Sequence, residues 1–91
     1  MTDLVARSVT VRGLVQGVFF RDTTRKVARS IGVAGWVSNE SDGTVQAWLE
    51  GEPDAVDQVL RFLRTGPPEA EVVSVTVDEE QPAGHDTFEI R

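Results

Sequence analysis

The stretch 8–32 reads SVTVRGLVQGVFFRDTTRKVARSIG and places a strand, a loop and a helix in succession. Val9 and Val11 alternate with polar residues, which is the period of a strand with one covered face. Residues 22–31 then carry small and apolar side chains at helical spacing, and Gly32 stands where a left-handed helix cap is expected. A strand joined to a helix by a glycine-containing loop is therefore the unit around which the rest of the chain must be arranged.

The remainder of the chain predicts a second helix and further strands. Alternating or apolar stretches predict strands at residues 34–38, 45–50 and 73–77, with a short closing strand at residues 88–90. The polar turn NESDGT joins the first two of these strands as a hairpin. The second helix begins near Pro53, which suits the first helical position, and Gly66-Pro67-Pro68 ends it.

This order of elements, strand-helix-strand-strand-helix-strand, is that of the ferredoxin-like split βαβ fold. Each predicted helix has one apolar face, so we expect both helices on one side of an antiparallel sheet, in an α+β two-layer α/β sandwich. The other side of the sheet, which carries Ser8, Thr10 and Arg12, is expected to face water. Because no repeat, low-complexity tract or charge block interrupts the sequence, we expect residues 1–91 to form a single domain.

Composition narrows the classes of partner. Nine basic residues stand against fifteen acidic ones, and the net charge of −6 would repel a polyphosphate backbone, so nucleic acid is not an expected partner. No apolar run approaches the roughly 20 residues of a membrane span, and no secretory signal is visible, so we expect a cytoplasmic protein without membrane association. The absence of cysteine excludes disulfides, thiolate zinc sites and a cysteine nucleophile.

The loop between the first strand and the first helix has the features of an anion site. Gly13 and Gly17 permit positive φ angles, so several backbone N–H groups can converge on one point. The helix beyond Phe20 adds the positive end of its dipole, and Arg21 on its first turn offers a planar fork of donors that matches two oxygens of a phosphate. The alternative, a tight turn beside a surface arginine, stays open, because this glycine spacing matches no nucleotide-binding loop and is common by chance.

Topology is expected to bring Asn39 to the same place. In the split βαβ arrangement the first two strands run in the same direction, so their carboxyl ends lie at the same edge of the sheet. The loop 13–19 leaves the first of these ends and Asn39 stands at the second, which predicts that Asn39 lies beside Arg21. Its carboxamide can donate and accept without titrating, and so can hold a water molecule. An asparagine that caps its own hairpin turn is the alternative.

Two longer patterns resemble the signatures of the acylphosphatase family. The stretch VRGLVQGVFFR, residues 11–21, matches Gly-x-Val-Gln-Gly-Val-x-Phe-Arg, and GWVSNESDGTV, residues 35–45, matches Gly-Trp-Val-x-Asn followed by Gly-x-Val. The resemblance covers nearly the whole chain and extends to EGEP, GPP and the closing FEIR. It departs at Glu40, where many relatives carry Thr or a similar small hydroxyl residue.

The resemblance implies the ferredoxin-like fold and hydrolysis of acyl phosphates to a carboxylate and inorganic phosphate. It places the family's phosphate-binding arginine on Arg21 and its water-orienting asparagine on Asn39. Its phosphate-binding loop falls on Gly13, Leu14, Val15, Gln16, Gly17, Val18 and Phe19. A small-molecule acyl phosphate is therefore the expected substrate, and a monomer is the expected state.

This chemistry needs few side chains. The leaving group is a carboxylate, which departs without a proton, so the reaction needs charge stabilisation on the phosphoryl oxygens and an aligned nucleophile rather than a general acid. Arg21 and the loop amides meet the first need, and Asn39 holding a water molecule meets the second. The single histidine, His85, lies far along the chain from both motifs, and the carboxylates show no metal-ligand spacing, so neither a catalytic triad nor a metal or other cofactor is expected.

Two other functions share these features. An acylphosphatase-like accessory domain of a larger protein that handles carbamoyl phosphate would carry the same motifs, but neither a linker nor a further domain is visible in the 91 residues. A binding module for phosphate or a phosphometabolite would keep the pocket without turnover, and would not need Asn39 to position a water molecule. We therefore expect a hydrolytic enzyme.

Overall fold

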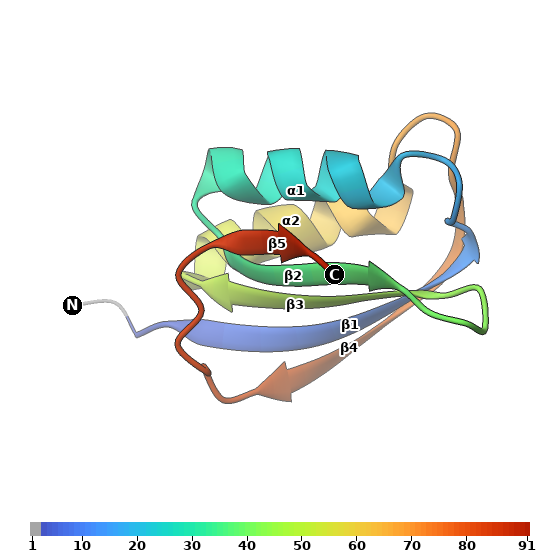
Figure 1. Ribbon diagram of the computed structural model, residues 1–91. Coiled ribbons are helices and arrows are strands. Elements are labelled where there is room, and N and C mark those ends of the chain that lie inside the picture. The colour runs from blue at the N-terminus through green and yellow to red at the C-terminus, as the bar shows by residue number, and fades with distance from the viewer. Residues whose placement is uncertain (1–2) are drawn as a thin grey trace.

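The computed structural model describes residues 3–91, and Figure 1 shows a layer of two helices on a layer of strands. The elements are, in chain order, β1 (Val5–Leu14), α1 (Phe20–Ile31), β2 (Ala34–Asn39), β3 (Val45–Gly51), α2 (Pro53–Thr65), β4 (Glu71–Glu80) and β5 (Phe88–Ile90). The five strands form one sheet in the order β4-β1-β3-β2-β5, and both helices lie on the same face of it. The ferredoxin-like α+β sandwich expected from the sequence is confirmed.

The four longer strands pair antiparallel, as expected, and the closing strand does not. β1 pairs antiparallel with both β3 and β4, and β2 pairs antiparallel with β3. β5 pairs parallel with β2, with Phe88 opposite Gly35 and Ile90 opposite Val37, so the sheet is mixed. This parallel pairing carries the last residues of the chain toward the carboxyl end of β2, where Asn39 lies.

β4 is longer than the alternating valines at residues 73–77 predict. It pairs with β1 from Ala6 opposite Glu80 to Leu14 opposite Glu71, because ladder hydrogen bonds join backbones and allow acidic side chains at the strand ends to stay exposed. The same pairing draws Gly13 and Leu14 into β1. The connection between β1 and α1 is therefore residues 15–19, shorter than the expected loop 13–19.

The core lies between the sheet and the helices and fixes the start of α1. Val9 and Val11 are buried while Arg12 on the opposite face is exposed, as the alternation predicts. Phe20, the first residue of α1, is also buried and packs its ring against Phe62 of α2, with 6.2 Å between the centroids. Within residues 3–91 there is no helix long and apolar enough to cross a membrane.

A buried carboxylate fastens the loop that leads to β5. Glu50 in β3 is 2% exposed and accepts a hydrogen bond from Trp48 Nε1 at 3.0 Å. It also accepts hydrogen bonds from the backbone amides of Ala83 and Gly84 at 2.9 Å and of His85 at 3.1 Å. Burial acts to raise the pKa of Glu50, but the hydrogen bonds outweigh it and leave the pKa below its ordinary value. The Glu50 clamp, meaning the three hydrogen bonds from backbone amides, holds the loop that leads to β5 at the edge of β2.

Candidate active site

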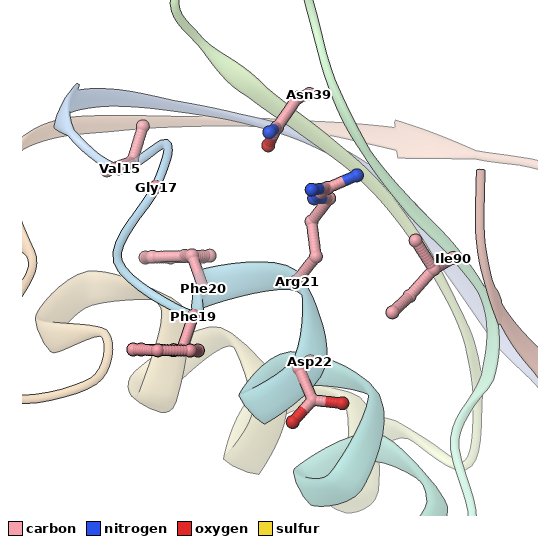
Figure 2. Close-up of a pocket in the computed structure, with 8 residues that line it drawn as sticks. All are labelled: Val15, Gly17, Phe19, Phe20, Arg21, Asp22, Asn39 and Ile90. Carbon is pink, nitrogen blue, oxygen red and sulfur yellow. The ribbon is translucent and has the colours of Figure 1, made fainter.

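A cavity of about 370 Å³ opens where β1 and β2 end and α1 begins (Figure 2). It is lined by Val15, Gly17, Phe19, Phe20, Arg21, Asp22, Asn39 and Ile90. These residues come from three places in the chain: the loop with the first turn of α1, the end of β2, and β5. The cavity therefore lies at the sheet edge that the order of the strands indicated.

The loop 15–19 contains two residues in the left-handed region. Gly17 has φ 74° and Phe19, which precedes α1, has φ 65°. Phe19 is the one non-glycine residue between residues 3 and 91 with a positive φ, and a bulky side chain in that region strains the backbone, as is common at functional sites. Across the described residues, no backbone hydrogen bond outside the helices and strands is donated by an amide of residues 15–19. The loop therefore has backbone N–H groups without a backbone acceptor among the described residues, next to the positive end of α1, and this arrangement favours an anion.

Arg21 lies on the first turn of α1 with its side chain exposed to solvent, and Figure 2 shows its guanidinium directed toward Asn39. In the part of the chain that the structure describes, no carboxylate forms an ion pair with it. The neighbouring carboxylate of Asp22 points away from the cavity and pairs with Arg25 at 3.0 Å and Lys26 at 3.1 Å. The hydrogen bond from Lys26 and its charge hold the pKa of Asp22 below the ordinary value. Arg21 thus keeps its donors for a ligand.

Asn39 is the last residue of β2 and lies opposite Val45 of β3. Figure 2 shows its carboxamide directed into the cavity, and its Oδ1 atom is buried without a hydrogen-bond partner among residues 3–91. Buried polar atoms in proteins are nearly always paired, because an unpaired one forfeits its hydrogen bonds to water. The alternative of a self-capping turn asparagine is wrong, because Asn39 Oδ1 accepts no backbone N–H among the described residues. Asp42 caps the turn instead and accepts the backbone N–H of Thr44 at 3.0 Å and its hydroxyl at 2.7 Å.

The seven residues of the expected phosphate loop do not all face the cavity. Those that line it are Val15, Gly17 and Phe19. Gly13 and Leu14 lie in β1 and do not line it, and the Leu14 side chain is 54% exposed. A Cβ atom on Gly13 would lie 2.1 Å from the carbonyl oxygen of Glu71. Glycine is needed there for the close approach of β4.

Gln16 and Val18 belong to the loop, but their side chains turn away from the cavity. Val18 is buried in the hydrophobic core. The Gln16 side chain donates from Nε2 to the carbonyl oxygen of Glu40 at 2.7 Å and to that of Thr44 at 2.9 Å. These two contacts join the loop to the turn between β2 and β3, a connection that nothing in the sequence indicated.

Ile90 lines the cavity although no sequence feature pointed to it. It arrives there through the parallel pairing of β5 with β2, which the backbone hydrogen bond from Arg91 N to Val37 O, at 2.9 Å, extends by one residue. The apolar spacing of residues 88–90 predicted a strand, but three residues carry no information about the strand with which they pair. Together with Val15 and Phe20, Ile90 adds apolar surface to the cavity.

Comparison with known proteins identifies the family. The sequence profile of acylphosphatases matches residues 7–90. The chain belongs to the acylphosphatase family. An acylphosphatase from Rubrobacter xylanophilus is 52% identical over 84 residues, which cover 91% of this chain and 76% of that protein. The solved acylphosphatase structure from Coxiella burnetii has a TM-score of 0.94 at 38% identity over 98% of this chain and 94% of its own. The acylphosphatase structure from Bacillus subtilis has a TM-score of 0.93 at 33% identity, with coverages of 96% and 98%.

The family expected from the motifs around Arg21 and Asn39 is thus confirmed, and with it the assignment of the chain to the acylphosphatase hydrolases, which act on small acyl phosphates.

Proposed function

We propose that the chain hydrolyses the carboxyl–phosphate bond of small acyl phosphates in the cavity at the start of α1, without a metal ion. One observation carries this assignment of the site: the Arg21 guanidinium and the unpartnered Asn39 Oδ1 atom meet at a single cavity. The guanidinium supplies positive charge and the carboxamide a fixed hydrogen-bond acceptor. The loop 15–19 adds backbone donors beside them.

In this proposal the phosphoryl group binds to Arg21 and to the amides of the loop 15–19. Two N–H groups of the guanidinium match two phosphoryl oxygens, and the remaining oxygen faces the loop amides and the positive end of α1. Gly13 and Leu14 act from β1, where they fix the point at which the loop leaves the sheet. Charge on the phosphoryl oxygens increases toward the transition state, so donors held in place beforehand stabilise that state most.

Asn39 orients the attacking water molecule. Its Oδ1 atom, which has no partner among the described residues, accepts a hydrogen from water and directs the water oxygen toward phosphorus. A bond forms between this oxygen and phosphorus while the bond from phosphorus to the carboxyl oxygen breaks, and the electron pair leaves with the carboxylate. The proton of the water passes to the phosphate or to solvent. Because Arg21 and the end of α1 provide the positive charge, no step requires a metal ion.

We further propose that the protein is a cytoplasmic monomer of one domain. The cysteine-free composition suits a reducing compartment. The net charge of −6 disfavours nucleic acid as a partner. Light scattering on the purified protein should give the mass of a single chain, and a larger mass would contradict the monomer.

The test of the function is hydrolysis of a simple aromatic acyl phosphate by the purified chain, with the reaction measured as the loss of the substrate's ultraviolet absorbance. Rates with no added metal and after treatment with a strong chelator should be equal. A loss of activity on chelation that added metal restores would overturn the metal-free mechanism. Tight binding of inorganic phosphate with no turnover would instead support the phosphate-binding module.

A further inference from the structure

The side chain of Gln16 bridges two segments that build the proposed site. Gln16 lies in the loop between β1 and α1, whereas Glu40 and Thr44 flank the turn between β2 and β3. Its Nε2 atom donates to the carbonyl oxygens of both residues, at 2.7 Å to Glu40 and at 2.9 Å to Thr44. Both hydrogens of the planar Gln16 amide are therefore used, one on each carbonyl group. The two bonds fix the orientation of the amide as well as the distance between the loop and the turn.

The turn between β2 and β3 does not need Gln16 to close. Glu40 N donates to Thr44 O at 2.9 Å, and Gly43 N donates to Glu40 O at 3.1 Å. Asp42 adds its own hydrogen bonds to the amide and hydroxyl of Thr44. The turn is thus a unit held by its own bonds, and the Gln16 contacts join this unit to the loop.

Asn39 immediately precedes this turn, so the position of the turn relative to the loop also sets the position of Asn39 relative to the loop amides. Gln16 does not line the cavity, and its side chain is already committed to two carbonyl groups. We propose that Gln16 is a positioning residue that holds the Asn39 carboxamide at the correct distance from the bound phosphoryl group. This inference rests on the proposed function of the cavity and on Asn39 as the group that orients water.

Four variants test it: Gln16→Met, Asn39→Ala, their combination, and Gln46→Met as the matched control. Gln46 donates from Nε2 to the Thr10 hydroxyl at 2.9 Å on the sheet face that carries no helix, so its replacement removes a comparable side-chain contact away from the cavity. Gln16→Met should lower kcat roughly 10- to 100-fold, because a misplacement near 1 Å is costly in a positioned reaction. The constant for competitive inhibition by inorganic phosphate should change less than about threefold. Gln46→Met should retain the kcat of the parent.

The double variant decides whether Gln16 acts through Asn39. If it does, Gln16→Met should lower kcat in the parent and leave kcat unchanged when Asn39 is already Ala, because the group that it positions is gone. A full multiplicative loss in the double variant would overturn the proposal for Gln16 while leaving Asn39 its role. If Asn39→Ala alone keeps the parent kcat, the proposed function of Asn39 fails instead, so the two failures are distinguishable.

Gln16→Glu provides a second readout that remains informative if Gln16→Met folds poorly. At neutral pH its carboxylate has no hydrogen to donate to the two carbonyl groups, whereas the protonated form has one O–H donor. The ratio of its kcat to that of the parent should therefore rise as the pH falls toward about 4.3, the ordinary pKa of glutamate, while the ratio for Gln16→Met stays flat. A ratio for Gln16→Glu that stays constant or falls with decreasing pH, with rates corrected for spontaneous hydrolysis, would overturn the proposal.

Discussion

The guanidinium of Arg21 and the carboxamide of Asn39 face a common cavity, although one stands on the first turn of α1 and the other on the last residue of β2. Their meeting follows from strand direction. β1 and β2 are both antiparallel to β3, so they run the same way and their carboxyl ends share one edge of the sheet. The sheet therefore brings the loop before α1 and the end of β2 to the same cavity.

Arg21→Gln should abolish acyl phosphate hydrolysis while leaving the fold intact. We expect a loss of at least roughly 10²-fold, the usual effect of removing a donor that stabilises charge in the transition state. The side chain is exposed and without an ion pair among the described residues, so the unfolding midpoint should stay close to that of the parent. Arg61→Gln, at an exposed position on α2, is the control and should keep full activity. Near-parent activity in Arg21→Gln would show that the arginine has another role.

Asn39→Ala should reduce turnover strongly while inorganic phosphate still binds as a competitive inhibitor. The variant loses the group that orients the attacking water molecule but keeps Arg21 and the loop amides that bind the anion. The substitution deletes a buried Oδ1 atom that has no hydrogen-bond partner among residues 3–91, so it should not lower the free energy of unfolding through a lost hydrogen bond at that atom. Initial rates, phosphate inhibition and urea unfolding measure the three quantities. Equal losses of phosphate binding and of rate would make Asn39 an anchor for the anion.

Glu50→Gln should destabilise the protein at neutral pH by about 1–3 kcal/mol. In the parent, three backbone N–H groups donate to the Glu50 carboxylate, whereas in the variant some of them would face the NH₂ group of the amide, which is itself a donor. The pKa of Glu50 is lowered in the folded protein, so its ionised form stabilises the fold above the unfolded-state pKa of about 4.3. This contribution is lost as the pH falls through the lower pKa of the folded state. Urea unfolding of parent and variant across this range should show their difference narrowing below about pH 4. A difference that does not narrow as the pH falls below about 4 would contradict the lowered pKa of Glu50.

Gly35→Ala should destabilise the fold far more than Gly32→Ala. Both residues have positive φ, at 135° and 91°, but a Cβ on Gly35 would lie 1.8 Å from the carbonyl oxygen of Trp48, whereas no atom lies within 4 Å of a Cβ on Gly32. Backbone strain alone should cost Gly32→Ala about 1–3 kcal/mol, and Gly35→Ala must in addition separate β2 from β3. Urea unfolding measures both, and similar midpoints for the two variants would contradict the close approach of the strands.

The sequence predicted most of the architecture because its signals are local. The alternation of Val9 and Val11, the glycine cap at Gly32 and the proline at Pro53 each depend on neighbouring residues alone. The order of elements then implied the topology, and the topology implied that Asn39 would lie near Arg21. The prediction was less accurate where the pairing of strands decides their length. β4 extends beyond the alternating valines at residues 73–77, and Gly13 belongs to β1 because β4 pairs with it.

The sequence by itself determined the kind of fold, the family, and the two motif residues whose side chains face the cavity, Arg21 and Asn39. These depend on local periodicity and on residue patterns. The tertiary structure alone decided that β5 adds parallel to β2 and brings Ile90 to the cavity, and that Glu50 clamps the loop before it. It also decided that the Gln16 side chain turns from the cavity toward the backbone of the neighbouring turn. The physical reason is that each of these contacts joins segments far apart in the chain, and its partner is chosen by how the backbones pack.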